Sequence, residues 1–235
     1  MLSCAPCYTN PMPETIRINK FLAHSMGLSR READSAVQAG RVTINGQKAI
    51  LGAAVSSSDH IAFDGRPISA QSDYTYLTFN KPVGYLCSRR SQGGVPTIFE
   101  ILPHKYRSLK PVGRLDKNSS GLILLTDDGD FAHRMTHPSF HKTKTYQVRL
   151  DQPLQPLHQQ MISDYGVTLE DGISKFLVEK TEQGYIVTMQ EGRNRQIRRT
   201  FAALGYTVTK LHRTTFGPYS LNGMRKGEHR LADKL

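Results

Sequence analysis

The chain has 235 residues, and its 31 lysines and arginines against 20 acidic residues give a formal net charge of +11. With 38% hydrophobic residues it is too apolar to be intrinsically disordered, and it is long enough for one or two domains with proper cores. The longest aliphatic run, Leu122–Leu125, is far too short for a membrane span. A basic protein of this kind most often binds a polyanion, nucleic acid first, although charge that serves only solubility is the alternative.

Residues 1–14 contain three prolines and no periodic pattern, which predicts a disordered tail. They lack the charged start and apolar stretch of a signal peptide, so the cytoplasm is the expected compartment. Cys4 and Cys7 form a single CxxC pair without the second pair that a zinc site needs, and Cys87 is expected to be an ordinary semi-buried thiol.

A small module is predicted over residues 15–66. Its first helix, at residues 17–26, has apolar residues at helical spacing and ends at Gly27. Ser29 and Glu32 form a capping box for a second helix that runs to about Ala39. Residues 41–46 alternate and lead into an Asn-Gly hairpin turn, and a further strand is expected at 61–63.

The segment IRINKFLAHSMGLSRREADSAVQAGRVTINGQKA resembles an S4 RNA-binding domain in its helix, SRREA turn, second helix and Asn-Gly hairpin. This resemblance implies binding to structured RNA. Arg30 and Arg31 stand at a helix N-terminus, where backbone amides and the helix dipole already favour phosphate. The residues expected to contact RNA in this module are Lys20, Arg30, Arg31 and Arg41.

After a polar linker at residues 67–73, a second domain is predicted over residues 74–235. Strands joined by hairpins and occasional helices favour an α+β fold with a mixed or mainly antiparallel sheet. The expected strands are 75–80, 121–126, 145–150 and 185–190; the expected helices are 131–136 and about 194 to 205, followed by a segment interrupted by glycine and proline.

Three short segments of this domain carry candidate chemistry. In GRLD, Arg114 and Asp116 would point to one face of an extended chain and Leu115 into the core. In EGRNRQIRR, helical spacing would place Arg195, Arg198 and Arg199 on one face. Taken alone, GRLD could be a surface ion pair, and EGRNRQIRR could be a row of arginines that only binds phosphate. The third segment, KTYQV, contains Tyr146, and a strand tyrosine alone is ordinarily a packing residue.

Taken in order, Asn80–Gly84, GRLDKNSSGLILLTDDGD, KTYQV and EGRNRQIRRTFAALGY resemble the RNA pseudouridine synthases, most closely the ribosomal RNA branch with an N-terminal S4 domain. The resemblance covers the chain from about residue 15 onward. It implies an isomerase that converts a uridine of ribosomal RNA to pseudouridine without a metal or organic cofactor. Such enzymes are usually monomers.

The resemblance also implies residue roles. Asp116 matches the essential carboxylate, and Arg114 matches the arginine that enters the RNA helix and helps to displace the base. Tyr146 matches the tyrosine that stacks under the base and assists proton removal, and Arg198 matches the basic residue paired with the aspartate. Further phosphate contacts near the site are expected from Arg193, Arg195 and Arg199.

The chemistry fits these residue types. Detaching uracil from C1′ builds oxocarbenium character, which a carboxylate can stabilise or capture covalently, while removal of the 2′ proton to give a glycal is an alternative. The target uridine has to be flipped out of folded RNA, which costs roughly a few kcal/mol.

Two other functions are compatible with parts of the sequence. One is a non-catalytic RNA-binding ribosome assembly factor, which would leave the order of the motifs unexplained. The other is a metal-dependent nuclease or phosphatase using Asp127, Asp128 and Asp130, although DDGD after an apolar strand is more typical of a turn that starts a helix. The segments at 96–103, 167–172 and 216–229 look closer to large-subunit than to small-subunit enzymes.

Overall fold

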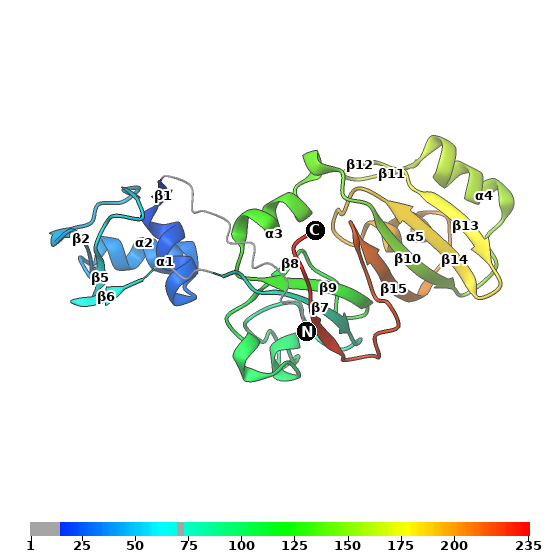
Figure 1. Ribbon diagram of the computed structural model, residues 1–235. Helices are drawn as coiled ribbons and strands as arrows, with labels where there is room; N and C mark the ends of the chain where they lie inside the picture. The colour runs from blue at the N-terminus through cyan, green and yellow to red at the C-terminus, as the bar shows by residue number, and fades with distance from the viewer. Residues whose placement is uncertain (1–14, 70–72) are drawn as a thin grey trace, which may run out of the picture. The chain divides into compact units, whose positions relative to one another are not determined.

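The computed structural model describes residues 15–69 and 73–235 (Figure 1). The chain divides into two compact units, Met1–Tyr74 and Thr75–Leu235. The expected tail at residues 1–14 lies outside the described residues, as do residues 70–72 of the linker predicted at 67–73. The first two residues of that linker belong instead to strand β6 (Arg66–Ile68), which pairs with β5 (Ile61–Phe63). Within the described ranges, none of the helices combines the length and hydrophobicity that crossing a bilayer requires.

The small unit packs two helices against short strands (Figure 1). Its sheet has the order β3-β2-β5-β6, and β1 pairs with β4. The elements are α1 (Ile18–Met26), α2 (Arg30–Gln38), β1 (Ile16–Arg17), β2 (Val42–Ile44), β3 (Gln47–Lys48), β4 (Ala54–Val55), β5 (Ile61–Phe63) and β6 (Arg66–Ile68).

Local sequence signals account for these elements. The Ser29 hydroxyl accepts from the Glu32 amide at 3.1 Å, and the Glu32 carboxylate accepts from the Ser29 amide at 2.7 Å, which confirms the capping box. Asn45 and Gly46 both have positive φ angles, 51° and 81°, as a two-residue hairpin turn requires. The apolar sides of both helices meet the sheet in one small core.

The large unit is built on a nine-stranded sheet with the main order β13-β14-β10-β15-β9-β7-β17; β8 pairs with β9, and β16 with β15. Among the strands of this sheet that the structure describes, only β9 and β15 pair in parallel, so the sheet is mixed and mainly antiparallel. The strands are β7 (Tyr76–Lys81), β8 (Lys110–Val112), β9 (Ser120–Thr126), β10 (Lys144–Leu150), β13 (Leu177–Thr181), β14 (Gly184–Met189), β15 (Val208–Phe216), β16 (Tyr219–Ser220) and β17 (His229–Leu231); a separate hairpin pairs β11 (Val167–Leu169) with β12 (Gly172–Ser174).

The helices of the large unit are short. They are α3 (Gly129–Thr136), α4 (Pro156–Gln160), a π-helical turn at Met161–Tyr165, α5 (Gln196–Ala203) and single 3₁₀ turns at Ile98–Glu100, His104–Tyr106 and Pro138–Phe140. The helix expected at 131–136 begins two residues earlier because the Asp128 carboxylate caps it by accepting from the amides of Asp130 and Phe131.

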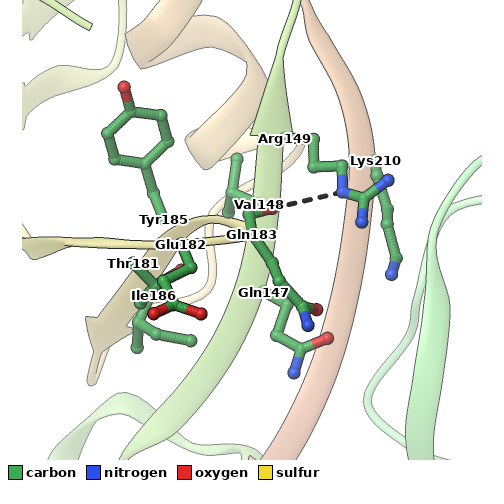
Figure 2. A pocket seen from close by; sticks show the side chains of 9 residues that line it. All are labelled: Gln147, Val148, Arg149, Thr181, Glu182, Gln183, Tyr185, Ile186 and Lys210. Carbon is green, nitrogen blue, oxygen red and sulfur yellow. Dashed lines mark hydrogen bonds between the residues drawn. The ribbon is translucent and has the colours of Figure 1, made fainter. Parts of the chain in front are cut away.

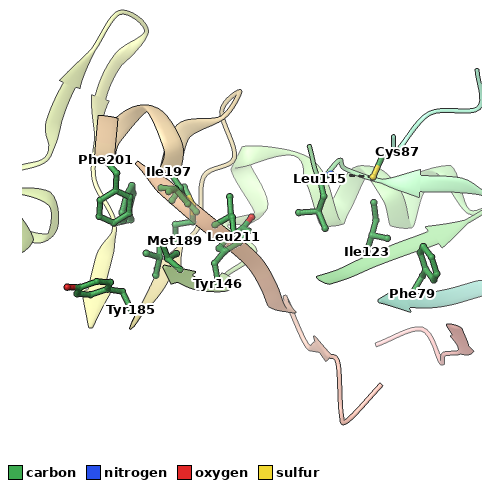
Figure 3. Close-up of a cluster of buried hydrophobic side chains, with 14 of the residues drawn as sticks. Phe79, Cys87, Leu115, Ile123, Tyr146, Tyr185, Met189, Ile197, Phe201 and Leu211 are labelled. Carbon is green, nitrogen blue, oxygen red and sulfur yellow. Dashed lines mark hydrogen bonds between the residues drawn. The ribbon is translucent and has the colours of Figure 1, made fainter. Parts of the chain in front are cut away.

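Strand β9 is covered on both faces. Ile123 and Leu125 belong to the larger core, in which Ile197 and Phe201 of α5 meet Tyr146 and Leu211 of the sheet (Figure 3). Leu122 and Leu124 point the other way, into a second core with Phe131 and Met135 of α3. This explains why the sequence of β9 is a continuous apolar run.

The parallel pairing of β9 with β15 depends on Gly121, which lies opposite Arg213. A Cβ atom at Gly121 would lie 2.2 Å from the Arg213 carbonyl oxygen and 2.6 Å from its amide nitrogen, and the φ angle is +108°. No side chain can be placed there without separating the two strands.

We therefore expect Gly121→Ala to destabilise the protein by about 3 kcal/mol or more, because backbone overlap adds to an unfavourable φ angle. Gly172→Ala is the matched control: its φ angle is +107°, but its added Cβ would meet nothing closer than an Arg193 nitrogen at 3.7 Å. Urea unfolding of both variants measures the difference. Equal losses would show that backbone angle alone, and not the approach of the strands, requires glycine at position 121.

Candidate active site

The loop between β8 and β9 presents Asp116. Val112 ends β8, Gly113 turns the chain with a φ angle of 71°, and the next residues run outside regular structure to Ser120. Leu115 is buried in the larger core, Arg114 is exposed, and the Asp116 side chain is 33% exposed. The buried leucine between them therefore anchors a loop whose cation and carboxylate remain accessible to a ligand.

A fully buried lysine holds this loop through its backbone carbonyl groups. Lys81, the last residue of β7, donates from Nζ to the carbonyl oxygens of Asp116 (3.1 Å), Ser119 (2.7 Å) and Pro82 (3.0 Å). Burial lowers the pKa of Lys81, while nearby Cys87 and Asp116 oppose that shift. The motifs of the sequence predict no role for Lys81. The signal that could have shown one is a lysine that directly follows the strand predicted at 75–80.

The segment that follows β7 holds the same loop from a second side. The Gly84 amide donates to the Lys117 carbonyl at 2.8 Å, and the Leu115 amide donates to the Cys87 sulfur at 3.4 Å (Figure 3). Cys87 is buried, more fully than the predicted semi-buried thiol, and burial raises the pKa of its thiol. Backbone contacts therefore fix the position of Asp116 and leave its carboxylate free for chemistry.

The nearest cation to the Asp116 carboxylate is Arg195, at 3.5 Å, and not Arg198 as the sequence predicted. Arg195 has a left-handed φ angle of 47° and lies at the position before the first residue of α5, so it does not continue the helix face of Arg198 and Arg199. The prediction that all three share one helix face is therefore wrong at Arg195. Both partners of the ion pair are accessible and the contact is long, so it contributes little stability.

Arg198 instead contacts the backbone around the loop. It donates from Nη2 to the Asn118 carbonyl at 2.8 Å and from Nη1 to the Val208 carbonyl at 2.7 Å. Burial lowers the pKa of this guanidinium, with Arg195 adding to the effect and Asp116 opposing it. Arg198 thus joins the loop that carries Asp116 to α5 and to the start of β15.

Tyr146 lies on β10, buried in the larger core that also contains Leu115. Cross-strand pairing places Tyr146 opposite Arg213 of β15, and Arg213 opposite Gly121 of β9. Two strand spacings, roughly 10 Å, therefore separate the backbones of Tyr146 and Gly121. The KTYQV strand therefore lies two strands away from the end of the loop that carries Asp116, with β15 between them.

Lys144 links this strand to the segment before α5. Its ammonium group donates to the carbonyl oxygens of Lys142, Gln190 and Glu191. Burial, with Arg213 nearby, lowers the pKa of Lys144 to about 8. Lys144 thus holds the segment before α5 against the start of β10, the strand that carries Tyr146.

Arg193 and Arg199, which were expected to hold phosphates, are bound within the protein. Both pair with Asp171 in the β11–β12 turn, Arg199 through two hydrogen bonds of 3.0 and 2.7 Å. Arg193 also donates to three carbonyl oxygens of that turn. The hydrogen bond from Arg199 holds the pKa of Asp171 below its ordinary value. These two arginines attach the hairpin to α5.

The basic residues of the small unit differ in how accessible their side chains are to a ligand. Arg30 and Arg31 are exposed in the first turn of α2, and Lys20 is half-buried on α1. Arg41 is bound to both carboxylate oxygens of Asp64 and lies 4.5 Å over the Phe63 ring. Arg41 therefore joins the start of β2 to the end of β5, and Arg30 and Arg31 remain the accessible pair.

The three carboxylates considered for a metal serve the fold or face solvent. Asp128 caps α3 and accepts hydrogen bonds from Tyr76 and Lys234, while Asp127 accepts from the Thr75 amide. In the part of the chain that the structure describes, no three His, Cys, Asp or Glu side chains are grouped as a metal site. The turn interpretation of this segment is the one the structure supports.

A pocket of about 390 Å³ lies on the sheet where β10, β15 and the β13–β14 turn meet (Figure 2). Arg149, Lys210 and Glu182 line it, and Arg149 donates to the Gln183 carbonyl at 3.2 Å. None of the predicted site residues lines this pocket. The candidate site is therefore the accessible loop at Asp116 and not this hollow.

The two arginines near Asp116 should respond differently to substitution. We expect Arg198→Gln to cost about 2 kcal/mol of stability and at least about tenfold in kcat, because two charge-assisted backbone hydrogen bonds are lost beside the loop. Arg195→Gln should change stability by less than about 0.5 kcal/mol. Urea unfolding and turnover of both variants test this, and a larger stability loss for Arg195→Gln would contradict the observed pairing.

Comparison with known proteins gives consistent matches. Residues 75–203 match the family model described as RNA pseudouridylate synthase, and residues 16–61 match the S4 domain. The chain is 38% identical over 222 residues to ribosomal small subunit pseudouridine synthase A of Pasteurella multocida, covering 92% of this chain and 95% of that protein. It is 37% identical over 241 residues to ribosomal large subunit pseudouridine synthase B of Pseudomonas aeruginosa, covering 96% of this chain and 62% of that protein. A crystal structure of a pseudouridylate synthase superimposes with a TM-score of 0.66 at 32% identity, over 93% of this chain and 96% of the other.

Proposed function

The chain belongs to the RNA pseudouridylate synthase family and carries an S4 domain, and we propose that its substrate is ribosomal RNA, in which it isomerises a specific uridine. It is an isomerase, an RNA pseudouridine synthase. Relatives named for the small and the large ribosomal subunit match at 38% and 37% identity, so ribosomal RNA as a class is proposed. The preference for the large subunit stays a prediction. We also propose that the enzyme acts as a monomer in the cytoplasm.

The observation that carries this proposal is the placement of Asp116. Its backbone is fixed by Lys81, Cys87 and Gly84, while its carboxylate stays accessible beside Arg195. A fixed carboxylate can stabilise the positive charge that develops at ribose C1′, or bond to that carbon, without reorganising during the reaction.

The neighbouring residues fit the remaining steps. Arg114 is exposed, and within residues 15–69 and 73–235 its guanidinium makes no hydrogen bond or ion pair, so it can fill the gap that the flipped base leaves. Tyr146 is 7% exposed, and uracil would stack against the accessible part of its ring while it turns. Arg198 acts as a positioning residue for the loop, through its bond to the Asn118 carbonyl.

Two measurements test this function. The purified protein should convert uridine to pseudouridine in 16S or 23S rRNA transcripts, and rRNA from cells without the gene should lack the corresponding pseudouridine. If neither transcript is modified and cellular rRNA is unchanged, the proposal of ribosomal RNA as the substrate is wrong. A catalytically inactive assembly factor would bind the transcripts and leave every uridine unchanged.

A further inference from the structure

The segment between β7 and β8 contains a second pocket that no motif predicted. It has a volume of about 340 Å³ and is lined by Arg89, Ser91, Thr97, Phe99, Glu100 and Arg107. These residues come from the stretch after Cys87, the 3₁₀ turn at Ile98–Glu100 and the end of the turn at His104–Tyr106. Two arginines thus line one concavity.

The charge of this pocket is positive. Its single carboxylate, Glu100, accepts from the Thr97 amide at 2.7 Å and completes the capping box of its own 3₁₀ turn. The Arg107 guanidinium is exposed and makes no hydrogen bond or ion pair with any residue that the structure describes. It therefore keeps its donors for a ligand, whereas Arg41, Arg193 and Arg199 have theirs occupied by carboxylates.

The pocket is tied to the catalytic loop. Gly84 and Cys87 of the same segment contact Lys117 and Leu115, the residues on either side of Asp116. Arg89 follows Cys87 by two residues, a span of at most roughly 7 Å along the chain. A ligand in the pocket would therefore lie near whatever occupies the site at Asp116.

A guanidinium fork matches the oxygens of a phosphate, and the substrate strand carries a phosphate on each side of the target nucleotide. We propose that Arg89 and Arg107 bind a backbone phosphate of the substrate RNA next to the flipped uridine. This inference rests on the proposed function. It replaces the phosphate role that Arg193 and Arg199 cannot fill while they bind Asp171. Binding there would hold the strand beside the gap left by the base.

The test compares Arg107→Gln and Arg107→Lys with Lys180→Gln, which removes the same charge from β13 at the other end of the sheet. Binding to the rRNA transcript that the wild type modifies is measured over a range of salt concentrations, together with kcat. Arg107→Gln should weaken binding about five- to tenfold and reduce the slope of log K against log salt by about 0.7–0.9, the change for one phosphate contact. Arg107→Lys should lose less, and kcat should stay within about twofold.

Ethylation of single phosphates locates the contact. With the wild type, ethylating a phosphate adjacent to the target uridine should reduce binding, and with Arg107→Gln that particular effect should disappear. The proposal is overturned if Arg107→Gln binds like Lys180→Gln, if kcat falls while binding is unchanged, or if the affected phosphate lies away from the target. A wild type that modifies no transcript would instead refute the proposed function, which is a separate result.

Discussion

Replacing Asp116 by asparagine is expected to lower the rate of pseudouridine formation by about a thousandfold or more, because no other side chain of the loop can supply the negative charge at C1′. RNA binding and folding should be unchanged. The asparagine has the same shape, and the backbone carbonyl of residue 116 still accepts from Lys81 and from the Ser119 amide. Single-turnover conversion, RNA affinity and urea unfolding are measured on one preparation.

Asp164→Asn is the matched control for this variant. Asp164 is an exposed aspartate in the turn Met161–Tyr165, and the same loss of charge there should leave turnover unchanged. If Asp116→Asn kept more than a tenth of wild-type turnover, the carboxylate would not be the group that acts at the ribose. If it lost activity only together with stability, a structural role would explain the result.

Lys81→Met is expected to destabilise the protein by about 3 kcal/mol or more, as much as Gly121→Ala. Methionine fills a similar volume but leaves the carbonyl oxygens of Pro82, Asp116 and Ser119 without their shared donor, in a place that water does not reach. Because two of those carbonyls belong to the loop that presents Asp116, turnover should fall as well, even at temperatures where the variant stays folded.

Lys117→Met separates this effect from a general loss of charge. Lys117 is exposed in the same loop, and its replacement should change the unfolding free energy by less than about 0.5 kcal/mol. The two variants are compared by urea unfolding and by kcat in the folded range. Equal stability of both would mean that the buried ammonium group contributes nothing net, and that Cys87, Gly84 and Arg198 hold the loop without it.

Much of the fold was predictable because its signals are local. The capping box at Ser29 and the hairpin turn at Asn45 depend on residues within three positions of one another, and both are present in the structure. The alternation in β10 and the apolar run in β9 likewise identified strands. These patterns report on helical or strand periodicity, which neighbouring residues determine together.

The longest strand, β15, was missed. Its sequence VTKLHRTTF is more than half polar, and its pairing with β10 contains two register shifts that interrupt a simple alternation. Its position in the middle of the sheet comes from partners far away in the chain, β10 on one side and β9 on the other. Propensity within nine residues carries no information about such partners.

The sequence by itself determined the family, the two kinds of domain and the motif that contains Asp116, because these depend on residue identities at fixed spacing. Only the tertiary structure decided which cations serve the site. It placed Arg195 beside Asp116, joined Arg198 to the loop backbone, and bound Arg193 and Arg199 to Asp171. The physical reason is that a guanidinium on a long side chain pairs with whichever acceptor the fold brings within reach, and that acceptor here lies 20 to 80 residues away along the chain.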